Sequence, residues 1–232
     1  MVENNIIQDE TAKKAAGYAA ADLVENGMTI GLGTGSTAKY FIEKLVLRHK
    51  EGLEVQAVST SLRSEKLAKD GGIPIIDINT LTSLDMVVDG ADEIDDAKQM
   101  IKGGGGALLR EKIVATMSKE MIIVVDEKKL VSKLGKFPLP VEILPFGYLS
   151  IVHQINQLGY KGSLRKNEKN EFYVTDNQNY IYDIRFSSII LDPENLHNEL
   201  KRIVGVIETG LFLHLASRIV IGYKDGSVEI RS

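Results

Sequence analysis

Cysteine is absent from the 232-residue sequence, which excludes disulfides, thiolate catalysis and thiolate-bound zinc. No apolar run is long enough to cross a membrane, and the first residues lack the basic-then-apolar pattern of a signal peptide. With a net charge of −4, the protein lacks the general basic character of nucleic-acid-binding proteins. We therefore expect a cytoplasmic protein with no nucleic acid or membrane partner. Because the overall charge is negative, any anion-binding site must be formed by a small group of neighbouring residues.

Strands alternate with helices in the first half of the chain. Short apolar segments lie at 28–32, 53–58, 73–76, 84–88 and 121–125. Helical patterns at 9–25, after residue 37, at 61–70 and at 108–119 separate or flank them. This alternation predicts an α/β fold with a parallel sheet covered on both faces.

The pattern changes after Asp126. Three of the five prolines lie within 136–147, which we interpret as an extended crossing between domains. Helices near 148–158 and 193–204, strands near 172–175 and 180–186, and a turn at 177–179 predict a small α+β unit. The segments 218–223 and 228–230 are strand-like, but their pattern does not show which sheet they join.

A glycine-rich turn at 31–37, GLGTGST, lies between a predicted strand and a predicted helix. Backbone N–H groups and a helix N-terminus in such a turn favour a phosphate, and Thr34, Ser36 and Thr37 add hydroxyl donors. The motif is neither a complete dinucleotide fingerprint nor a P-loop. Anion binding and a tight turn with a Ser/Thr helix cap both remain open.

An acidic loop follows the strand at 84–88, at the end where open parallel sheets bind ligands. Asp89 and Asp92 suit acid–base chemistry; a divalent-metal site is the alternative, although the spacing matches no calcium loop. We interpret Asp95 and Asp96 as residues of a solvated turn.

Lys102 precedes four successive glycines, 103–106, which are entropically costly to order and suit a close approach of backbone to ligand. Lys102 could stabilise an oxyanion or bind a phosphate; a floppy surface loop is the alternative. Glu111 points away from the apolar stripe of Leu109, Ile113 and Met117, and so faces either solvent or a cleft as a general base. Lys129 is a further cation after a strand, and the four histidines show no metal-ligand spacing.

Four motifs in order, GLGTGSTA at 31–38, DGADEID at 89–95, KGGGGALLREK at 102–112 and LGKFPLPVE at 134–142, resemble the ribose-5-phosphate isomerase A family. The resemblance covers nearly the whole chain. It implies a Rossmann-like parallel-sheet catalytic domain, residues 1–130 plus 206–232, and a smaller α+β (ferredoxin-like) lid domain, residues 131–205. It also implies interconversion of ribose 5-phosphate and ribulose 5-phosphate without metal or other cofactor, by a homodimer or homotetramer.

The resemblance assigns roles residue by residue. Glu111 is implied to be the base that moves a proton between C1 and C2, Asp89 to open the sugar ring and shuttle a hydroxyl proton, and Lys102 to stabilise the enediolate. Asp92 joins this catalytic set. The implied substrate contacts are Thr34, Gly35, Ser36, Thr37, Asp89, Gly90, Ala91, Asp92, Lys102, Gly103, Gly104, Gly105 and Lys129. Gly106 is expected to tolerate alanine, which several family members carry there.

Three other functions are weighed against the isomerase. A non-catalytic sugar-phosphate sensor of the same fold would not need Glu111 with Asp89, and would usually carry a DNA-binding domain. A nucleotide-binding oxidoreductase would need a ribose-binding acid after the second strand, where Ser59, Thr60 and Ser61 stand. A coenzyme A transferase-like enzyme would need a nucleophilic glutamate on a different element.

Overall fold

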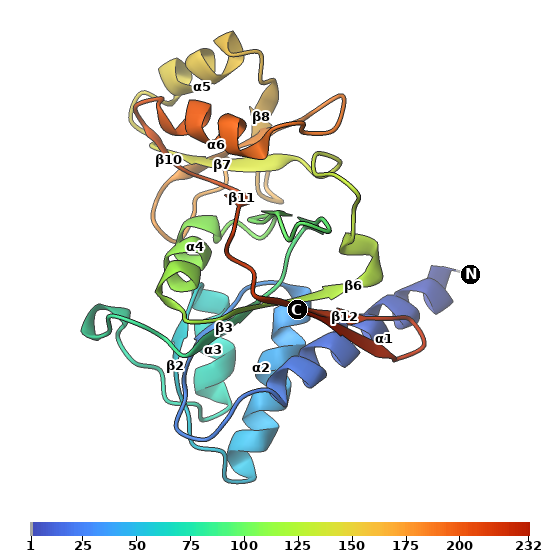
Figure 1. The fold of residues 1–232 in the computed structure, drawn as a ribbon. Coiled ribbons are helices and arrows are strands. Elements are labelled where there is room, and N and C mark those ends of the chain that lie inside the picture. The colour runs from blue at the N-terminus through green and yellow to red at the C-terminus, as the bar shows by residue number, and fades with distance from the viewer. Residues whose placement is uncertain (1) are drawn as a thin grey trace. The chain divides into compact units, whose positions relative to one another are not determined.

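The computed structural model describes residues 2–232, with side chains from Gln8 onward. Contacts divide the chain into two units, whose elements are labelled in Figure 1. The first unit comprises residues 2–91, 110–130 and 215–232, and the second comprises 92–109 and 131–214. Whether residues 131–205 act as a lid stays a prediction.

The first unit contains a six-stranded sheet in the order β13-β12-β6-β3-β1-β2. Its strands are parallel except β13, which runs antiparallel to β12. The strands are β1 (Thr29–Leu32), β2 (Gln56–Ser59), β3 (Met86–Asp89), β6 (Met121–Asp126), β12 (Arg218–Gly222) and β13 (Val228–Arg231). The predicted parallel sheet is confirmed, and the strand-like tail completes it.

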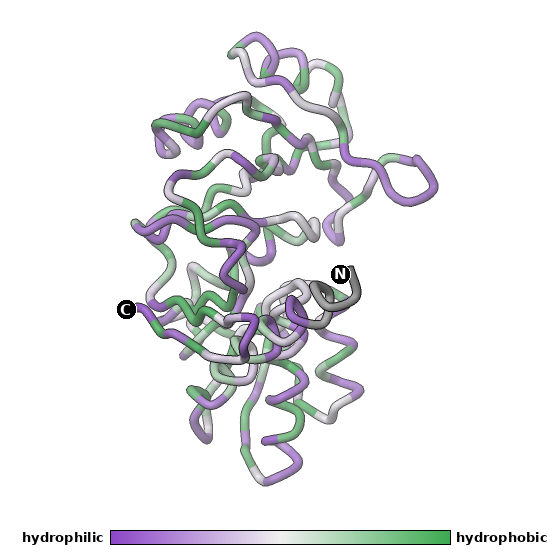
Figure 2. The backbone as a smooth tube through the Cα atoms, turned by 90° about the vertical axis from the view of Figure 1, so that its right-hand side faces the viewer, coloured by the Kyte–Doolittle hydropathy of each residue, from purple (hydrophilic) through white to green (hydrophobic). Residues whose placement is uncertain are grey.

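Helices cover both faces of this sheet. Figure 1 shows α1 (Val2–Ala21), α2 (Ser36–Lys50) and α3 (Leu62–Asp70) on one side and α4 (Leu108–Met117) on the other. Alternate strand residues follow this division: Ile30 and Val88 pack in one core with Phe41 of α2, whereas Gly31 and Val87 approach Val114 of α4. Figure 2, coloured by residue hydropathy, shows hydrophobic residues close to the carboxyl terminus. In this part of the chain β12 pairs with β6.

Asp85, just before β3, forms a solvent-exposed ion pair with Lys119. Asp85 accepts a hydrogen bond from Lys119 Nζ at 2.8 Å and another from the Thr29 amide at 2.9 Å. The Lys119 bond, followed by the Thr29 bond, lowers the pKa of Asp85. The Thr29 contact joins the start of β3 to β1. It helps to fix the register of β3 against β1 and so the position of the residue at the other end of β3.

The prediction of a strand at 73–76 is wrong. Only an isolated bridge joins Ala57 to Ile75, with the Ala57 amide donating to Pro74 O at 2.9 Å and the Ile76 amide donating to Ala57 O at 2.9 Å. Pro74 has no N–H to extend this pairing, and the chain turns into a short 3₁₀ helix at Ile78–Thr80.

The second unit contains two antiparallel sheets, in the orders β10-β7-β9-β8 and β11-β5-β4, with α5 (Tyr148–Gln157) and α6 (Pro193–Lys201). The strands are β4 (Glu93–Ile94), β5 (Met100–Ile101), β7 (Leu139–Ile143), β8 (Gly162–Leu164), β9 (Tyr180–Ile184), β10 (Val206–Thr209) and β11 (Leu211–Phe212). Its core includes Val141, Ile155, Tyr182, Leu196 and Leu200.

Two predictions in the second unit are wrong. The proline-rich stretch 136–147 contains β7, a fully buried strand between β10 and β9, rather than an extended crossing. Pro140 has no N–H to donate, but its carbonyl accepts a hydrogen bond from the Gly210 amide at 2.7 Å. The segment 172–175 makes only isolated bridges, at Phe172 and Val174. The turn at 177–179 is confirmed, with Gln178 left-handed at φ 64°.

Candidate active site

Asp89 ends β3 as a fully buried carboxylate, with an exposed fraction of 0%. Its Oδ1 accepts hydrogen bonds from the amides of Thr34, at 2.9 Å, and Gly90, at 2.8 Å. Hydrogen bonds from two amides to one oxygen fix the direction of the carboxylate. The expectation that a strand would position Asp89 is confirmed.

The glycine-rich turn fits closely against this carboxylate. A Cβ on Gly33 would lie 2.3 Å from Asp89 Oδ1, so no residue larger than glycine fits between the turn and β3. Thr34 Oγ1 lies 2.7 Å from Thr60 Oγ1 and donates to Ser61 Oγ at 2.8 Å. Two of the three residues that argued against a nucleotide-binding acid, Thr60 and Ser61, therefore anchor the turn.

Gly35 of the same turn is the N-cap residue of α2, and no side chain makes a capping hydrogen bond there. Ser36 is exposed and Thr37 is buried in the first turn of the helix. Because no side chain caps them, the first amides of α2 suit an anion. The anion-binding interpretation of the turn is therefore supported over a turn closed by its own Ser/Thr cap.

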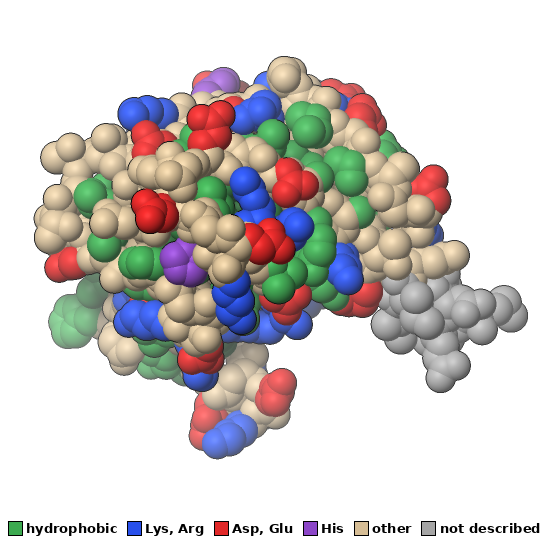
Figure 3. Space-filling model, turned by 90° about the horizontal axis from the view of Figure 1, so that it is seen from below, with side chains coloured by type: hydrophobic (Ala, Val, Ile, Leu, Met, Phe, Trp, Pro, Cys, Tyr) green, Lys and Arg blue, Asp and Glu red, His purple; other side chains and the backbone are tan. Residues whose placement is uncertain are grey.

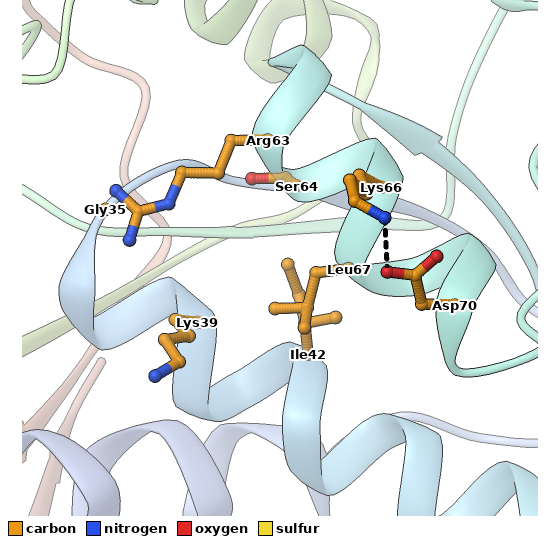
Figure 4. A pocket seen from close by; sticks show the side chains of 8 residues that line it. All are labelled: Gly35, Lys39, Ile42, Arg63, Ser64, Lys66, Leu67 and Asp70. Carbon is orange, nitrogen blue, oxygen red and sulfur yellow. Dashed lines mark hydrogen bonds and ion pairs between the residues drawn. The ribbon is translucent and has the colours of Figure 1, made fainter.

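A cavity of about 230 Å³ lies beside the turn, between α2 and α3 (Figure 4). Lys39, Arg63 and Lys66 line it above an apolar floor of Ile42 and Leu67. Figure 4 shows the Arg63 side chain extending toward Gly35, whereas Lys66 is paired with Asp70 at 2.8 Å. No motif in the sequence marks Arg63, which is one of three cationic residues in a polar helix.

Glu111 lies in the first turn of α4 and is 3% exposed. The predicted apolar stripe on this helix is wrong: Ile113 is 45% exposed, whereas Val114 and Ala115 are buried. Glu111 therefore lies on the buried side of α4, three positions before Val114, and does not face solvent. Glu111 is therefore a buried carboxylate and not a surface glutamate.

Lys102 follows β5 in the second unit and is 2% exposed. Its Nζ lies 5.2 Å from the centroid of the Phe212 ring, and its amide donates to Gly210 O at 2.8 Å. Asp92 Oδ2 accepts a hydrogen bond from the Gly104 amide at 2.7 Å. A buried lysine keeps little of its hydration, which strengthens its interaction with any nearby anionic group.

The glycine loop, Gly103–Gly106, is held by side chains and is not floppy. Arg165 Nη1 donates to the carbonyls of Gly103, at 2.9 Å, and Gly104, at 3.0 Å. Tyr173 Oη donates to Gly105 O at 3.3 Å. Sequence reasoning missed Arg165 and Tyr173, which lie far along the chain in a segment without a recognisable motif.

Gly106 does not fit the expectation that it tolerates alanine. Its φ of +85° is left-handed, and an added Cβ would lie 2.3 Å from Tyr173 Oη. An L-residue is strained in this conformation, so alanine here requires the loop or Tyr173 to shift.

Two of the remaining predicted residues lie in well-defined turns. Lys129 ends the short 3₁₀ helix Glu127–Lys129 that follows β6, which Asp126 caps through the Lys128 amide at 3.0 Å. Asp95 is not solvated as predicted: it is buried, and its Oδ1 accepts from the amides of Ala97, at 3.0 Å, and Gln99, at 2.9 Å.

Among the described residues, no three acidic or histidine side chains gather closely enough to hold a metal ion. The acidic segment 89–96 divides between carboxylates bonded to backbone amides and an exposed Asp96; the amide-bonded carboxylates are Asp89, Asp92, Glu93 and Asp95. These amide contacts hold the carboxylates in place, and the acid–base interpretation of the loop stays a prediction.

An open, mostly parallel sheet with buried acids and a glycine-rich turn at its strand ends is typical of the large class of α/β enzymes. The family model described as ribose 5-phosphate isomerase A (phosphoriboisomerase A) matches residues 56–226. A relative named ribose-5-phosphate isomerase A from Protochlamydia amoebophila is 53% identical over 99% of both chains. Another so named, from Bacillus mycoides, is 54% identical over 94% of this chain and 98% of its own.

Solved structures that resemble this chain carry the same enzyme name as these relatives. A ribose 5-phosphate isomerase from Plasmodium falciparum has a TM-score of 0.92 at 37% identity, covering 96% of this chain and 98% of its own. A D-ribose-5-phosphate isomerase solved in complex with phospho-erythronic acid has a TM-score of 0.89 at 37% identity, covering 95% and 97%. The chain belongs to the ribose 5-phosphate isomerase A family, as its motifs indicate.

Proposed function

We propose that this protein interconverts D-ribose 5-phosphate and D-ribulose 5-phosphate, an aldose–ketose isomerisation of the non-oxidative pentose phosphate pathway. The observation that carries the proposal is the burial of three charged side chains, Asp89, Lys102 and Glu111, at 0%, 2% and 3% exposure in a member of this family. Burying a charge is costly, so a folded protein keeps such groups where chemistry requires them. The phospho-erythronic acid bound by the related isomerase carries the phosphate and polar groups expected of such a ligand.

The proton transfer needs a base and a stabilised oxyanion, because a carbon-bound proton beside a carbonyl is weakly acidic. Glu111 takes the C2 proton of the open-chain sugar, the electron pair moves onto the C1 carbonyl oxygen, and an enediolate forms. Glu111 then returns the proton to C1, while the O2 hydroxyl proton moves to O1 and leaves the C2 carbonyl of the ketose. A positioned base contributes about 10²–10⁴-fold.

The other residues of the set have supporting roles. Asp89 helps to open the ring and shuttles a hydroxyl proton, and Lys102 stabilises the negative oxygen, where one such donor is worth roughly 10²–10³-fold. Asp92 holds the Gly104 amide, so its part in the reaction includes placing the loop that follows Lys102.

The phosphate binds at the turn formed by residues 34–37, and its binding energy fixes the reacting carbons in place. The uncapped start of α2 supports this assignment. The remaining proposed substrate contacts rest on the family resemblance. They are Gly90, Ala91, the glycines 103–105 and Lys129.

Conversion of ribose 5-phosphate by the purified protein, followed in both directions with EDTA present, tests the proposal. Rapid conversion in EDTA is expected, because no step above requires a metal or other cofactor. Tight binding of the sugar phosphate without conversion would instead support the sensor. Loss of activity in EDTA that magnesium restores would support a metal site in the acidic loop.

Location and assembly complete the proposal. We expect a cytoplasmic homodimer or homotetramer without a nucleic acid partner, as the resemblance implies. On the face shown in Figure 3, acidic and basic side chains are interspersed, which is unlike a nucleic-acid-binding surface. Within residues 2–232, no helix has the length and hydrophobicity needed to span a bilayer.

A further inference from the structure

Arg165 follows β8 in the second unit and contacts the glycine loop from outside the proposed catalytic set. We infer that Arg165 is a positioning residue for the isomerisation, because it aims the Gly105 amide as a hydrogen-bond donor for a substrate oxygen. This inference rests on the proposed function, which makes the glycine loop a substrate contact. It is argued from the hydrogen bonds of three successive peptide groups.

The C=O of one residue and the N–H of the next share one plane and point in opposite directions across a trans peptide. In the first peptide of the loop, Gly103 O accepts from Arg165 at 2.9 Å and the Gly104 amide donates to Asp92 at 2.7 Å. In the third, Gly105 O accepts from Tyr173 at 3.3 Å and the Gly106 amide donates to Gly103 O at 2.9 Å. Both ends of these two peptides are used within the protein.

The second peptide differs from its neighbours. Gly104 O accepts from Arg165 at 3.0 Å, whereas among the described residues the Gly105 amide has no protein acceptor. Gly105 is also exposed, while Gly103 and Gly106 are buried. Arg165 therefore holds the carbonyl end of a peptide whose N–H end is open to a ligand.

Arg165 is itself rigidly held. Its Nε donates to Asp183 Oδ2 at 2.8 Å and its Nη2 donates to Asp183 Oδ1, a two-pronged pair with side chains only 15% and 19% exposed. The guanidinium also lies 5.8 Å from the centroid of the Tyr173 ring. Arginine suits this site because its planar fork can bind a carboxylate and two carbonyls at once, which a lysine cannot do.

An amide held in this way strengthens its hydrogen bond as charge develops on a sugar oxygen, without reorganising at the moment of reaction. Its contribution is then larger in the enediolate-like transition state than in the bound sugar, and it appears in kcat rather than in KM. If the loop became disordered, the transition-state hydrogen bond from the Gly105 amide would be lost, even with Lys102 and Glu111 still in place.

Steady-state kinetics of Arg165→Ala with ribose 5-phosphate tests the inference. We expect kcat to fall by about 10–100-fold, at or below the lower limit of the roughly 10²–10³-fold that one lost oxyanion donor costs, with KM changed less than about threefold. Arg165→Lys should recover part of kcat, and so should guanidinium added to Arg165→Ala at non-denaturing concentration. Competitive inhibition by inorganic phosphate, which reports on the turn at 34–37, should be unchanged.

Arg185→Ala is the matched control, because Arg185 is an exposed arginine just beyond the same strand as Asp183. It should keep the wild-type kcat. Asp183→Asn, which retains an acceptor for Arg165, is a second variant that gives a smaller loss in the same parameter if Arg165→Ala fails to fold.

A wild-type kcat in Arg165→Ala overturns the inference, as does a loss that neither lysine nor guanidinium repairs and that weakens phosphate inhibition equally. An inactive wild-type protein would instead contradict the proposed function. The two failures are therefore distinguishable.

Discussion

The two units position their site residues by different means. In the first, Asp89 is bonded to the Thr34 and Gly90 amides at the end of a parallel strand. In the second, the glycine loop is bonded to the side chains of Asp92, Arg165 and Tyr173, and Arg165 is 62 positions from Gly103 in the sequence. Backbone support is built into the fold, whereas side-chain support can be removed by one substitution. The first should be robust and the second sensitive to changes outside the motifs.

Replacing the proposed base gives the largest expected effect. In Glu111→Gln we expect turnover to fall by about 10²–10⁴-fold with substrate affinity nearly intact, because the amide keeps the shape of the side chain and cannot accept the proton. Steady-state kinetics with calorimetric binding of ribose 5-phosphate measures both. Glu51→Gln, an exposed glutamate of the first unit, is the control. Loss of binding would make Glu111 a substrate-positioning residue.

Replacing Asp89 separates its support of the turn from its chemistry. Asp89→Asn keeps an oxygen for the Thr34 and Gly90 amides, so it should lose turnover while retaining stability and phosphate affinity. Asp89→Ala leaves both amides without this acceptor, at a cost of about 1–3 kcal/mol for each buried donor. Chemical denaturation and phosphate inhibition distinguish the two variants. Equal stability of both would show that water replaces the carboxylate and that the backbone support is weak.

Alanine at Gly106 tests the sensitivity of the side-chain-supported loop. Left-handed backbone costs an L-residue about 1–2 kcal/mol, and the added Cβ would also displace Tyr173. Gly159→Ala is the matched control in the same unit, since Gly159 has a φ of +92° and open space around its Cβ position. Gly106→Ala should lose both stability and kcat, and Gly159→Ala only stability. Wild-type kcat in Gly106→Ala would show that the loop adapts.

Removing the cation beside the phosphate turn should have the smallest effect. Arg63→Ala is expected to raise KM by about two- to fivefold without changing kcat, because an exposed charge near a phosphate contributes on the order of 1 kcal/mol or less. The difference from wild type should shrink at high salt. Lys69→Ala, on the same helix, is the control. A changed kcat would place Arg63 closer to the reacting carbons than the turn implies.

The sequence predicted the first unit better than the second, for physical reasons. The strand β6 is apolar from Met121 to Val125 and buried along its whole length, so its composition is sufficient to identify it. The strand β7 is equally buried but contains Pro140, and its prolines resembled a linker. Two-residue strands such as β4 and β5 are too short for any period to appear.

The same contrast holds for the candidate site. Motif residues such as Asp89, Lys102 and Glu111 could be named from the sequence because unusual residues cluster there. The burial of Glu111 could not, since the predicted stripe through Ile113 chose the wrong face of α4. Arg165 could not be found either, because its partners come from distant segments that only the fold brings together.

Deuterium uptake in D₂O, followed by NMR at C2 of ribose 5-phosphate and C1 of ribulose 5-phosphate, tests the central claim most directly. It observes the proton transfer itself and not the overall conversion. We predict that the wild-type protein incorporates deuterium at these carbons and that Glu111→Gln, although it binds the sugar, does so at least about 10²-fold more slowly. Uptake by Glu111→Gln at the wild-type rate would contradict the account, because another group would then be the base.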